Sequence, residues 1–256
     1  MTKVRLVAFD LDDTLAPSKS AISAEMAESL CRLLEVTEVL IISGGQWKQF
    51  KDQVLTHLYT DPAHLSRLHI MPTCGTRYLR HDGEEWRTIY EQPLRPRERD
   101  AAITLLEREA RRLGLWEEDT WGEVIEDRGT QITFSALGQS APIDAKRAWD
   151  PTGEKRSAIV GALEPLLPDL EIRSGGSTSV DITRKGIDKA YGMLRLSEQT
   201  GIPLDEMVFV GDRLDPEGND YPVKKLGVAS VDTTGPEQTV EIIDELMDGM
   251  VARCAL

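Results

Sequence analysis

Three aspartates near the start of the chain follow a short apolar stretch, and their spacing suits the binding of a metal ion. The residues Val4–Phe9 predict a buried strand of a parallel sheet, and Asp10, Asp12 and Asp13 come directly after it. In an extended chain Asp10 and Asp12 point to the same side, where their charges repel unless a cation or a shared proton compensates them. Mg2+ prefers such oxygen ligands, so the pattern favours a magnesium site. The plainer alternative is an acidic loop that caps the next helix.

Three further polar groups follow along the chain, two of them directly after apolar stretches that predict strands. These groups are Ser43-Gly44-Gly45 after Val39–Ile42, Lys189 after Gly186-Ile187-Asp188, and Gly211-Asp212 after Met207–Val210, with Gly218-Asn219-Asp220 shortly beyond. Each group alone has a plainer explanation: a helix N-cap for Ser43, a solvated charge for Lys189, and a turn for Gly218-Asn219-Asp220. Because ligands of parallel sheets gather at the carboxyl ends of the strands, the ordered set favours one shared site.

The order of the expected elements predicts an α/β protein with an insertion. Strands and helices alternate at both ends of the chain, which is typical of a doubly wound, Rossmann-like parallel sheet. Between them, strands around Asp82-Gly83, a helix at about Arg97–Leu113 and further strands up to Arg184 predict an α+β insert. We therefore expect residues 1–81 and 185–256 to form the core and residues 82–184 to form a cap domain that closes over a substrate.

Composition narrows the classes of partner. The formal net charge of −14 disfavours nucleic acid and anionic membranes, since both attract basic surfaces. No stretch approaches the roughly 20 apolar residues of a membrane span, and no signal-peptide pattern opens the chain. The three cysteines, Cys31, Cys74 and Cys254, show neither metal-ligand spacing nor a disulfide framework, so we expect a cytoplasmic protein. The four histidines form no ligand-like cluster and are expected at the surface or in loops: His57, His64, His69 and His81.

The ordered motifs resemble those of the haloacid-dehalogenase superfamily of phosphotransferases. The resemblance implies that Asp10 is a nucleophile that forms an aspartyl-phosphate, and that Asp12 is the general acid and base. It further implies that Ser43, with the amides of Gly44 and Gly45, binds the phosphate and that Lys189 pairs with the phosphate and Asp10. The implied ligands of Mg2+ are Asp10, the backbone carbonyl of Asp12, and Asp212, with Asn219 and Asp220 ordering the ion and its waters.

An insert between the Ser-Gly and Lys motifs is the layout of the type IIB cap, and several strings resemble the eukaryotic-type phosphomannomutases over nearly the whole chain. These strings are DLDDTL from Asp10, IEDR from Ile125, GGSTSVD from Gly175, the G-x-D-K pattern from Gly186, and Pro216–Asp220. The resemblance implies that Ser179 and Asp181 face sugar hydroxyls and that Arg128 contacts a phosphate or the sugar ring. The plainer alternative for Ser179 and Asp181 is an exposed strand face.

Departures from that family concern arginines that hold a second phosphate. Gln139 and Lys146 stand where the family has arginines in the cap, and Lys19 replaces an arginine near the nucleophile loop. Lysine keeps the charge but not the bidentate fork, and glutamine loses the charge. We therefore expect a Mg2+-dependent sugar-phosphate phosphatase, with phosphomannomutase as the alternative and a non-catalytic sugar-phosphate sensor as a remote one. A small phosphorylated sugar is the expected partner, and the cap offers a face for a homodimer.

Overall fold

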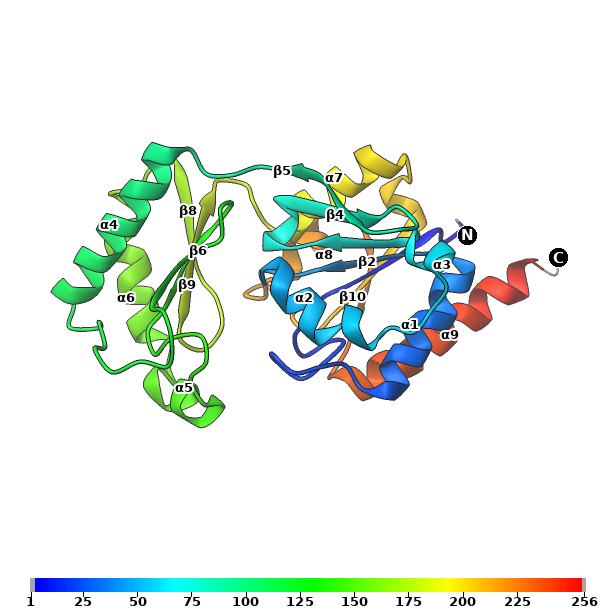
Figure 1. Cartoon of the computed structure of the whole chain (residues 1–256), viewed down its shortest axis with the longest axis horizontal. Coiled ribbons are helices and arrows are strands. Elements are labelled where there is room, and N and C mark those ends of the chain that lie inside the picture. Colours follow the sequence, from blue (N-terminus) through cyan, green and yellow to red (C-terminus); the bar gives the residue numbers. More distant parts are fainter. Residues whose placement is uncertain (1–2, 255–256) are drawn as a thin grey trace. The chain divides into compact units, whose positions relative to one another are not determined.

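The computed structural model describes residues 3–254, with side chains described up to residue 250, and contains two compact units. The first unit comprises the chain up to Glu91 and again from Asp188, and the second is Gln92–Ile187 (Figure 1). The expected boundary at residue 82 falls inside a hairpin, between β4 (Arg77–His81) and β5 (Trp86–Glu91), and the observed division places β5 in the first unit as well. Strand β5 pairs with β4, which pairs with β3 (Leu68–Met71) of the same sheet, and this pairing explains the shift.

The first unit is built on a mainly parallel sheet of seven strands. Their order is β11-β10-β1-β2-β3-β4-β5, and all neighbours from β11 to β3 pair in parallel. The α/β fold expected from the sequence is thereby confirmed. The parallel strands are β1 (Leu6–Phe9), β2 (Glu38–Ile42), β3 (Leu68–Met71), β10 (Met207–Gly211) and β11 (Ala229–Asp232).

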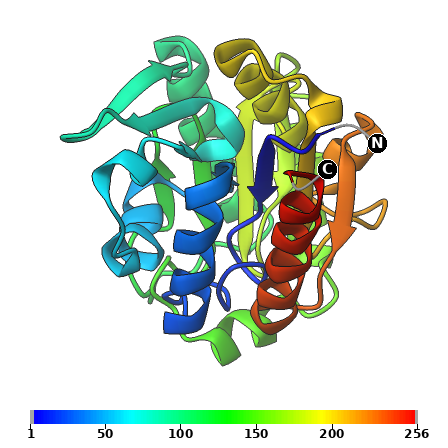
Figure 2. The ribbon, with the colours of Figure 1, turned by 90° about the vertical axis from the view of Figure 1, so that its right-hand side faces the viewer.

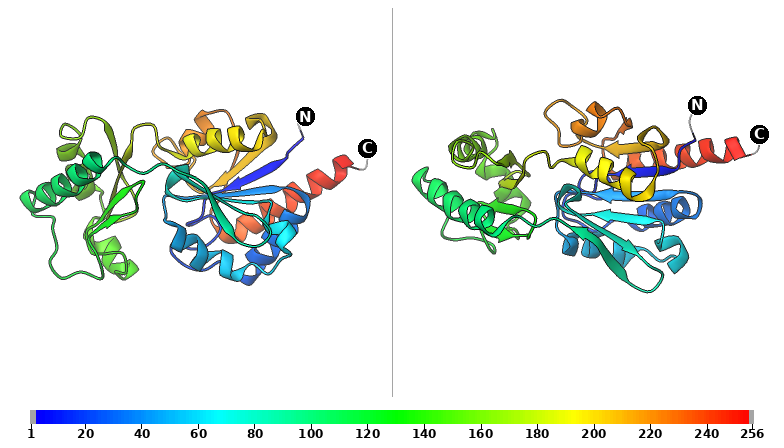
Figure 3. Two further views of the ribbon diagram at one scale, coloured as in Figure 1. Left: turned by 45° about the horizontal axis from the view of Figure 1, so that its top comes forward. Right: turned by 90° about the horizontal axis from the view of Figure 1, so that it is seen from above.

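Helices cover both faces of this sheet, because alternate residues of the buried strands point to opposite sides. Val7 and Phe9 pack with α1 (Ala24–Val36) and α9 (Pro236–Cys254) on one face, where Figure 2 shows the two helices side by side in blue and red. Leu6 packs with α7 (Lys189–Thr200) and α8 (Tyr221–Lys225) on the other face (Figure 3). The remaining short helices of the unit are α2 (Trp47–Gln53), α3 (Pro62–Leu65) and the 3-10 turns Leu55–His57, Thr73–Gly75 and Leu204–Glu206.

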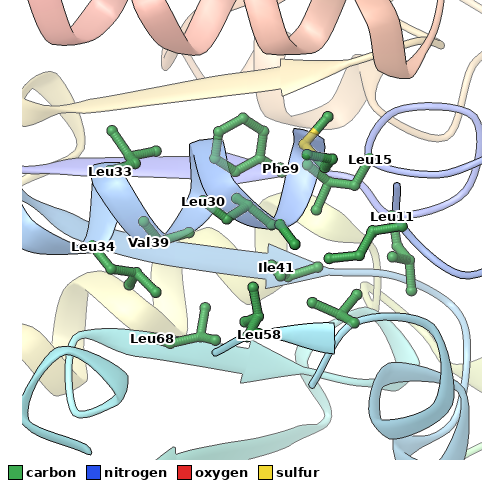
Figure 4. Close-up of a cluster of buried hydrophobic side chains, with 14 of the residues drawn as sticks. Phe9, Leu11, Leu15, Leu30, Leu33, Leu34, Val39, Ile41, Leu58 and Leu68 are labelled. Carbon is green, nitrogen blue, oxygen red and sulfur yellow. The ribbon is translucent and has the colours of Figure 1, made fainter. Parts of the chain in front are cut away.

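Helix α1 shows how local sequence builds this core. Ser23 caps the helix, as expected, because its side-chain oxygen accepts a hydrogen bond from the amide of Met26 at 3.1 Å. Apolar residues at helical spacing then face the sheet, and Leu30 and Leu33 pack beside Phe9 and its neighbours (Figure 4). Each such side chain contributes about 1.5–3 kcal/mol when it is fully buried, so one face of α1 fixes the helix on the sheet.

The second unit is an α+β domain with its own core. Its antiparallel sheet has the order β6-β7-β9-β8, formed by Ile125–Asp127, Ile132–Ser135, Ser179–Arg184 and Leu170–Ser174. One face of β7 and β9, with Phe134 and Ile182, packs against helices of the same unit. These helices are α4 (Pro96–Arg112), α5 (Ile143–Trp149) and α6 (Glu154–Leu163).

The structure corrects the expectation for two histidines. His69 lies inside β3 and is fully buried, and His81 lies in β4 and is also buried. Burial of His69 is possible because both ring nitrogens have partners: Nε2 lies 2.8 Å from Glu38 and Nδ1 lies 2.7 Å from the Tyr78 hydroxyl. The side chain of Cys254 lies outside the described residues.

Candidate active site

The carboxyl ends of three neighbouring strands bring the predicted motifs to one edge of the core sheet. Phe9 pairs in register with Ile41 of β2 and with Val210 of β10, so Asp10, Ser43 and Asp212 follow strands that end at the same level. The amide of Asp10 also donates to the carbonyl of Val210 at 3.0 Å. Residues far apart in the sequence therefore share this edge, as the strand pattern predicted.

Lys189 lies between two carboxylates at this edge. Its ammonium nitrogen is 2.6 Å from Asp10 Oδ1 and 2.5 Å from Asp220 Oδ1, and the lysine is only 1 % exposed. Burial alone would lower the pKa of Lys189, but the Asp10 and Asp220 carboxylates outweigh burial and raise it. The lysine thus keeps its charge, and the interpretation of Lys189 as a solvated surface residue is excluded.

Asp10, Asp212 and Asp220 form an acidic cluster that could hold a metal ion. One carboxylate oxygen of each lies within 4.8 Å of the others. Burial raises the pKa of Asp10 to about 7. The positive charge of Lys189 acts against this rise, and the negative charge of Asp220 adds to it. Burial likewise raises the pKa of Asp212, with a further contribution from Asp220. Three carboxylates around one lysine leave an excess of negative charge, and hard oxygen donors of this kind fit Mg2+.

The loop from Gly211 to Asp220 is folded tightly enough to require glycine at two positions. A Cβ atom at residue 211 would overlap the carboxylate of Asp220, and one at residue 218 would overlap the carbonyl of Arg213. Asp220 is fixed further because its Oδ2 accepts a hydrogen bond from the amide of Arg213 at 3.1 Å. Asn219 is exposed, and its expected part in ordering a metal ion stays a prediction.

The carboxylate of Asp12 is held by donors that the sequence analysis did not single out. Its Oδ2 accepts from Gln49 Nε2 at 2.9 Å, and its Oδ1 accepts from the backbone amide of Lys19 at 2.7 Å and from Gln53 Nε2 at 3.4 Å. Gln49 and Gln53 are four residues apart on α2, which directly follows the Ser43 motif. Two glutamines at this helical spacing were the signal that could have revealed them.

Thr14 is a third residue that the sequence analysis missed. It is fully buried, and its hydroxyl donates to Asp212 Oδ1 at 3.3 Å. The signal was its position two residues after Asp12 in the same loop. Thr14 thereby connects the loop after β1 to the acidic cluster after β10.

Ser43 is buried at the end of β2 and does not cap α2. The N-cap of that helix is Gln46, which makes no side-chain capping bond, so the plainer explanation of Ser43 does not hold. The Ser43 hydroxyl accepts from the amide of Gly45 at 3.2 Å. Gly44 is partly exposed beside it, whereas Gly45 is buried. The expected phosphate-binding role of this segment stays a prediction.

In the second unit, Ser179 and Asp181 lie on the polar face of β9. Asp181 Oδ1 accepts from Gln131 Nε2 at 2.8 Å and from the Thr133 hydroxyl at 2.7 Å, and Thr133 is its direct partner on β7. Ser179 pairs with Ser135 in the same way. These side chains are partly or fully buried, and Asp181 is also hydrogen-bonded, so this strand face is more than an exposed surface.

The three remaining predicted residues also lie in the second unit. Lys146 Nζ donates to the carbonyl of Gln139 at 2.7 Å, and Gln139 Nε2 donates to the Ser135 hydroxyl at 2.6 Å. The structure therefore brings Gln139 and Lys146 together beside the polar face of the sheet. Arg128 forms an ion pair with Glu126 at 2.7 Å.

A family model described as haloacid dehalogenase-like hydrolase matches residues 7–222. The chain belongs to this family, which confirms the resemblance drawn from the motifs and the expectation of an enzyme. Among the residues that the structure describes, no helix is both long and apolar enough to cross a membrane.

The relatives that match this chain in sequence are phosphomannomutases. Phosphomannomutase of Saccharomyces cerevisiae is 25 % identical over 260 residues, which cover 95 % of this chain and 94 % of the yeast protein. Phosphomannomutase 1 of Mus musculus is 23 % identical, covering 94 % of this chain and 91 % of the mouse protein.

Solved structures agree on the fold. A haloacid dehalogenase-like hydrolase from Bacteroides thetaiotaomicron has a TM-score of 0.64 at 19 % identity and covers 95 % of this chain and 100 % of its own. N-terminally truncated IMP-nucleotidase of Plasmodium falciparum has a TM-score of 0.73 at 15 % identity, covering 96 % and 70 %. Trehalose-6-phosphate phosphatase of Aspergillus fumigatus has a TM-score of 0.56 at 16 % identity, covering 95 % and 92 %.

Proposed function

We propose that this protein is a Mg2+-dependent phosphatase that hydrolyses a sugar phosphate through an aspartyl-phosphate on Asp10. The observation that carries the proposal is the buried Lys189 between Asp10 and Asp220, with Asp212 completing an acidic cluster. The buried lysine neutralises only part of the negative charge of these carboxylates, so a cation and a phosphate can still bind there. The names of the phosphomannomutase relatives, of IMP-nucleotidase and of trehalose-6-phosphate phosphatase each refer to a phosphorylated compound.

The proposed reaction has two steps at the carboxyl edge of the sheet. The Asp10 carboxylate attacks phosphorus, and the bond to the sugar oxygen breaks while Asp12 gives that oxygen a proton. Water then attacks the aspartyl-phosphate, loses a proton to Asp12 and releases inorganic phosphate, which regenerates Asp10. Gln49 and the amide of Lys19 hold the Asp12 carboxylate in place for both proton transfers.

The other residues stabilise charge. Mg2+, held by Asp10, Asp212 and the carbonyl of Asp12, would let an anionic nucleophile approach an anionic phosphate, with Asn219 and Asp220 ordering the site. Lys189 keeps a positive charge beside Asp10, where it would pair with a phosphate oxygen. The Ser43 hydroxyl and the amides of Gly44 and Gly45 are proposed to bind the remaining oxygens, which requires Gly45 to exchange its bond to Ser43.

Hydrolysis is favoured over mutase chemistry by the residues of the second unit, which we assign as the substrate-specificity cap. A mutase must hold a second phosphate, for which Gln139 offers no charge and Lys146 only a single ammonium group. That ammonium group already binds the Gln139 carbonyl. Ser179 and Asp181 are proposed to contact sugar hydroxyls and Arg128 the ring or its phosphate.

The test is phosphorus NMR of the purified protein with Mg2+ and mannose 1-phosphate, with and without a catalytic amount of glucose 1,6-bisphosphate. Free phosphate appearing without the bisphosphate supports the proposal. An Asp10→Asn variant serves as control and should release none. A sensor would give a different result: the wild-type protein would turn over no sugar phosphate, and Asp10→Asn would bind the sugar phosphate with unchanged affinity.

Phosphomannomutase is the second candidate, because its named relatives match along about 95 % of the chain. Conversion of mannose 1-phosphate to the 6-phosphate only in the presence of bisphosphate, at a rate far above phosphate release, would establish it. In that case Lys146 and Arg128 hold the second phosphate without the bidentate contacts expected of arginines at positions 139 and 146.

A further inference from the structure

A cavity of about 500 Å3 lies at the opposite edge of the core sheet, where the parallel strands begin. Arg5 lines it and directly precedes β1, whereas Asp10 directly follows that strand. At ~3.3 Å per residue, the two sites are about 16 Å apart along the strand. All lining residues belong to the first unit, so the cavity is complete within it.

The charge of the cavity wall is opposite in sign to that of the whole chain. Four basic residues line the cavity, Lys3, Arg5, Arg67 and Arg80, against two acidic ones, Glu35 and Glu38. Arg5 is paired with Glu206 at 2.9 Å. A basic surplus in a protein of net charge −14 is a local feature that attracts anions.

Two of these arginines are held by neutral groups. Arg67 Nη1 donates to the carbonyls of Leu34 at 3.1 Å and Glu35 at 2.5 Å, and Arg80 Nε donates to the carbonyl of Ser66 at 2.9 Å. Within the described part of the chain, neither guanidinium forms an ion pair, although many other arginines do. Their positions are therefore fixed while their charges stay available to a ligand.

The wall also contains a buried hydroxyl without a partner. Thr37 is 6 % exposed and lines the cavity, and its Oγ1 makes no hydrogen bond to any residue that the structure describes. Its backbone ends α1, where its amide donates to the carbonyl of Leu33, so the side chain is not needed as a cap. A buried hydroxyl left unsatisfied is unfavourable, and a rotation of the Thr37 side chain about χ1 toward the cavity would let a ligand oxygen satisfy it.

A rigid chain of hydrogen bonds, from the Tyr78 hydroxyl through His69 to Glu38, borders the cavity. Burial lowers the pKa of His69, against the raising effect of Glu38, so the imidazole is neutral near pH 7. His69 lies directly opposite Arg80 in the pairing of β3 with β4, so the two side chains leave the sheet on the same side. The wall is thus ordered before any ligand arrives.

We propose that this cavity is a binding site for a small organic anion carrying a phosphate monoester group, held by Arg67, Arg80 and the Thr37 hydroxyl. Guanidinium groups match the oxygen geometry of phosphate, and the volume lies in the range of small-molecule sites, about 300–1,000 Å3. The site is separate from the cluster around Asp10 and does not depend on the proposed catalytic function.

The test uses methylphosphonate, whose carbon–phosphorus bond resists hydrolysis, and follows backbone amide shifts by NMR in the full-length protein. Saturable shifts of Thr37, Arg67 and Arg80 are expected at the amino edge of the sheet. Any shifts of Gly44 and Gly211 report the other site separately. Arg80→Gln should weaken binding at the amino edge about tenfold or more, and Thr37→Val should weaken it severalfold without loss of stability, since its hydroxyl has no partner to lose.

Arg32→Gln is the matched control, because Arg32 is an exposed arginine of the same unit that pairs with Asp244 away from the cavity. It removes the same charge and should leave the affinity unchanged. Three outcomes overturn the proposal: shifts confined to the carboxyl edge, equal weakening by all three variants, or saturable binding of malonate without binding of methylphosphonate. The last would assign the site to carboxylates instead of phosphate monoesters.

Discussion

The acidic edge of the sheet in the first unit and the polar face of β9 in the second unit are organised differently. In the first unit, Asp10, Lys189 and Asp220 are buried charges in direct contact, and burial and neighbouring charges shift the pKa values of Asp10 and Lys189. In the second unit, Asp181 is bonded to the neutral groups of Gln131 and Thr133. Coupled charges can stabilise the changing charge of a reacting phosphate, whereas neutral hydrogen bonds suit recognition of hydroxyl groups. Substitutions in the first unit should therefore affect turnover, and those in the second should affect substrate binding.

The largest effect is expected for Asp10→Asn. It keeps the shape of the side chain but removes the nucleophile, so phosphate release should fall by about 10^4-fold or more. Asp13→Asn is the matched control, since Asp13 is an exposed neighbour whose backbone φ of 59° asparagine tolerates well. Phosphate release by Asp10→Asn at the wild-type rate would remove the basis of the contrast between the two units.

Lys189→Met should cost both activity and stability. It leaves Asp10 and Asp220 buried without their cation, a change expected to cost about 3–5 kcal/mol of unfolding free energy at pH 7. Because burial already raises the pKa of Asp10 and loss of Lys189 removes the main effect that lowers it, the folded variant binds more protons than the unfolded chain, and its stability should rise as the pH falls from 7 toward 4. Urea unfolding at several pH values measures this. Lys185→Met, at an exposed lysine, is the control and should show no such trend.

Mg2+ should stabilise the first unit through the acidic cluster. At ten times the dissociation constant, the ion is expected to add about 1.4 kcal/mol, which corresponds to a rise in Tm of about 3–6 °C. The rise should grow from pH 5 to pH 8, because burial raises the pKa of Asp10 to about 7 and the ion binds the ionised form. Asp212→Asn should abolish it, whereas the exposed Asp205→Asn should not. An equal rise in both variants would place the ion elsewhere.

Gln49→Ala tests whether neutral hydrogen bonds also matter at the catalytic edge. Loss of the 2.9 Å bond should let the Asp12 carboxylate move, and we expect kcat to fall about tenfold with little change in KM. Gln49→Asn tests whether the length of the side chain matters. Its shorter amide should not reach Asp12, so it should restore little of the lost kcat. The neighbouring Lys48→Ala changes an exposed side chain on the same helix and should have no effect on kcat.

The smallest effect is expected in the second unit. Asp181→Asn keeps one oxygen to accept from Gln131 and Thr133 but removes the charge, so KM for the sugar phosphate should rise about three- to tenfold with kcat nearly unchanged. Glu171→Gln, on neighbouring β8, is the control and should leave both constants unchanged. A fall in kcat as large as that of Gln49→Ala would show that both units take part in the chemical step.

The sequence predicted the acidic edge well because strand ends are local features. Asp10, Ser43 and Asp212 each follow a short apolar stretch, and parallel pairing then necessarily brings their strands' ends together. The sequence predicted the structure less well where the pairing of distant strands decides which sheet a segment joins. The hairpin from Arg77 to Glu91 has no local mark that assigns it to the core sheet, and its antiparallel pairing with β3 does so.

The missed residues have a similar explanation. Burial of His69 depends on Glu38 and Tyr78, which reach it across neighbouring strands, and no pattern around His69 shows these partners. The helical spacing of Gln49 and Gln53 marks them as a pair on one face of α2, but their contact with Asp12 emerges only once α2 is placed beside the loop after β1. Helix α2 ends at Gln53, and a short 3-10 turn, Leu55–His57, follows it.

The place of β1 in the sheet has a consequence for synthesis on the ribosome. This first strand pairs with β10, which the ribosome makes about 200 residues later, so the central sheet stays incomplete until that strand emerges. The second unit is continuous in sequence and has a hydrophobic core of its own. It can therefore fold while the first strands still wait for their partner, and the exposed apolar edge of β1 is the part of the nascent chain that needs protection from aggregation.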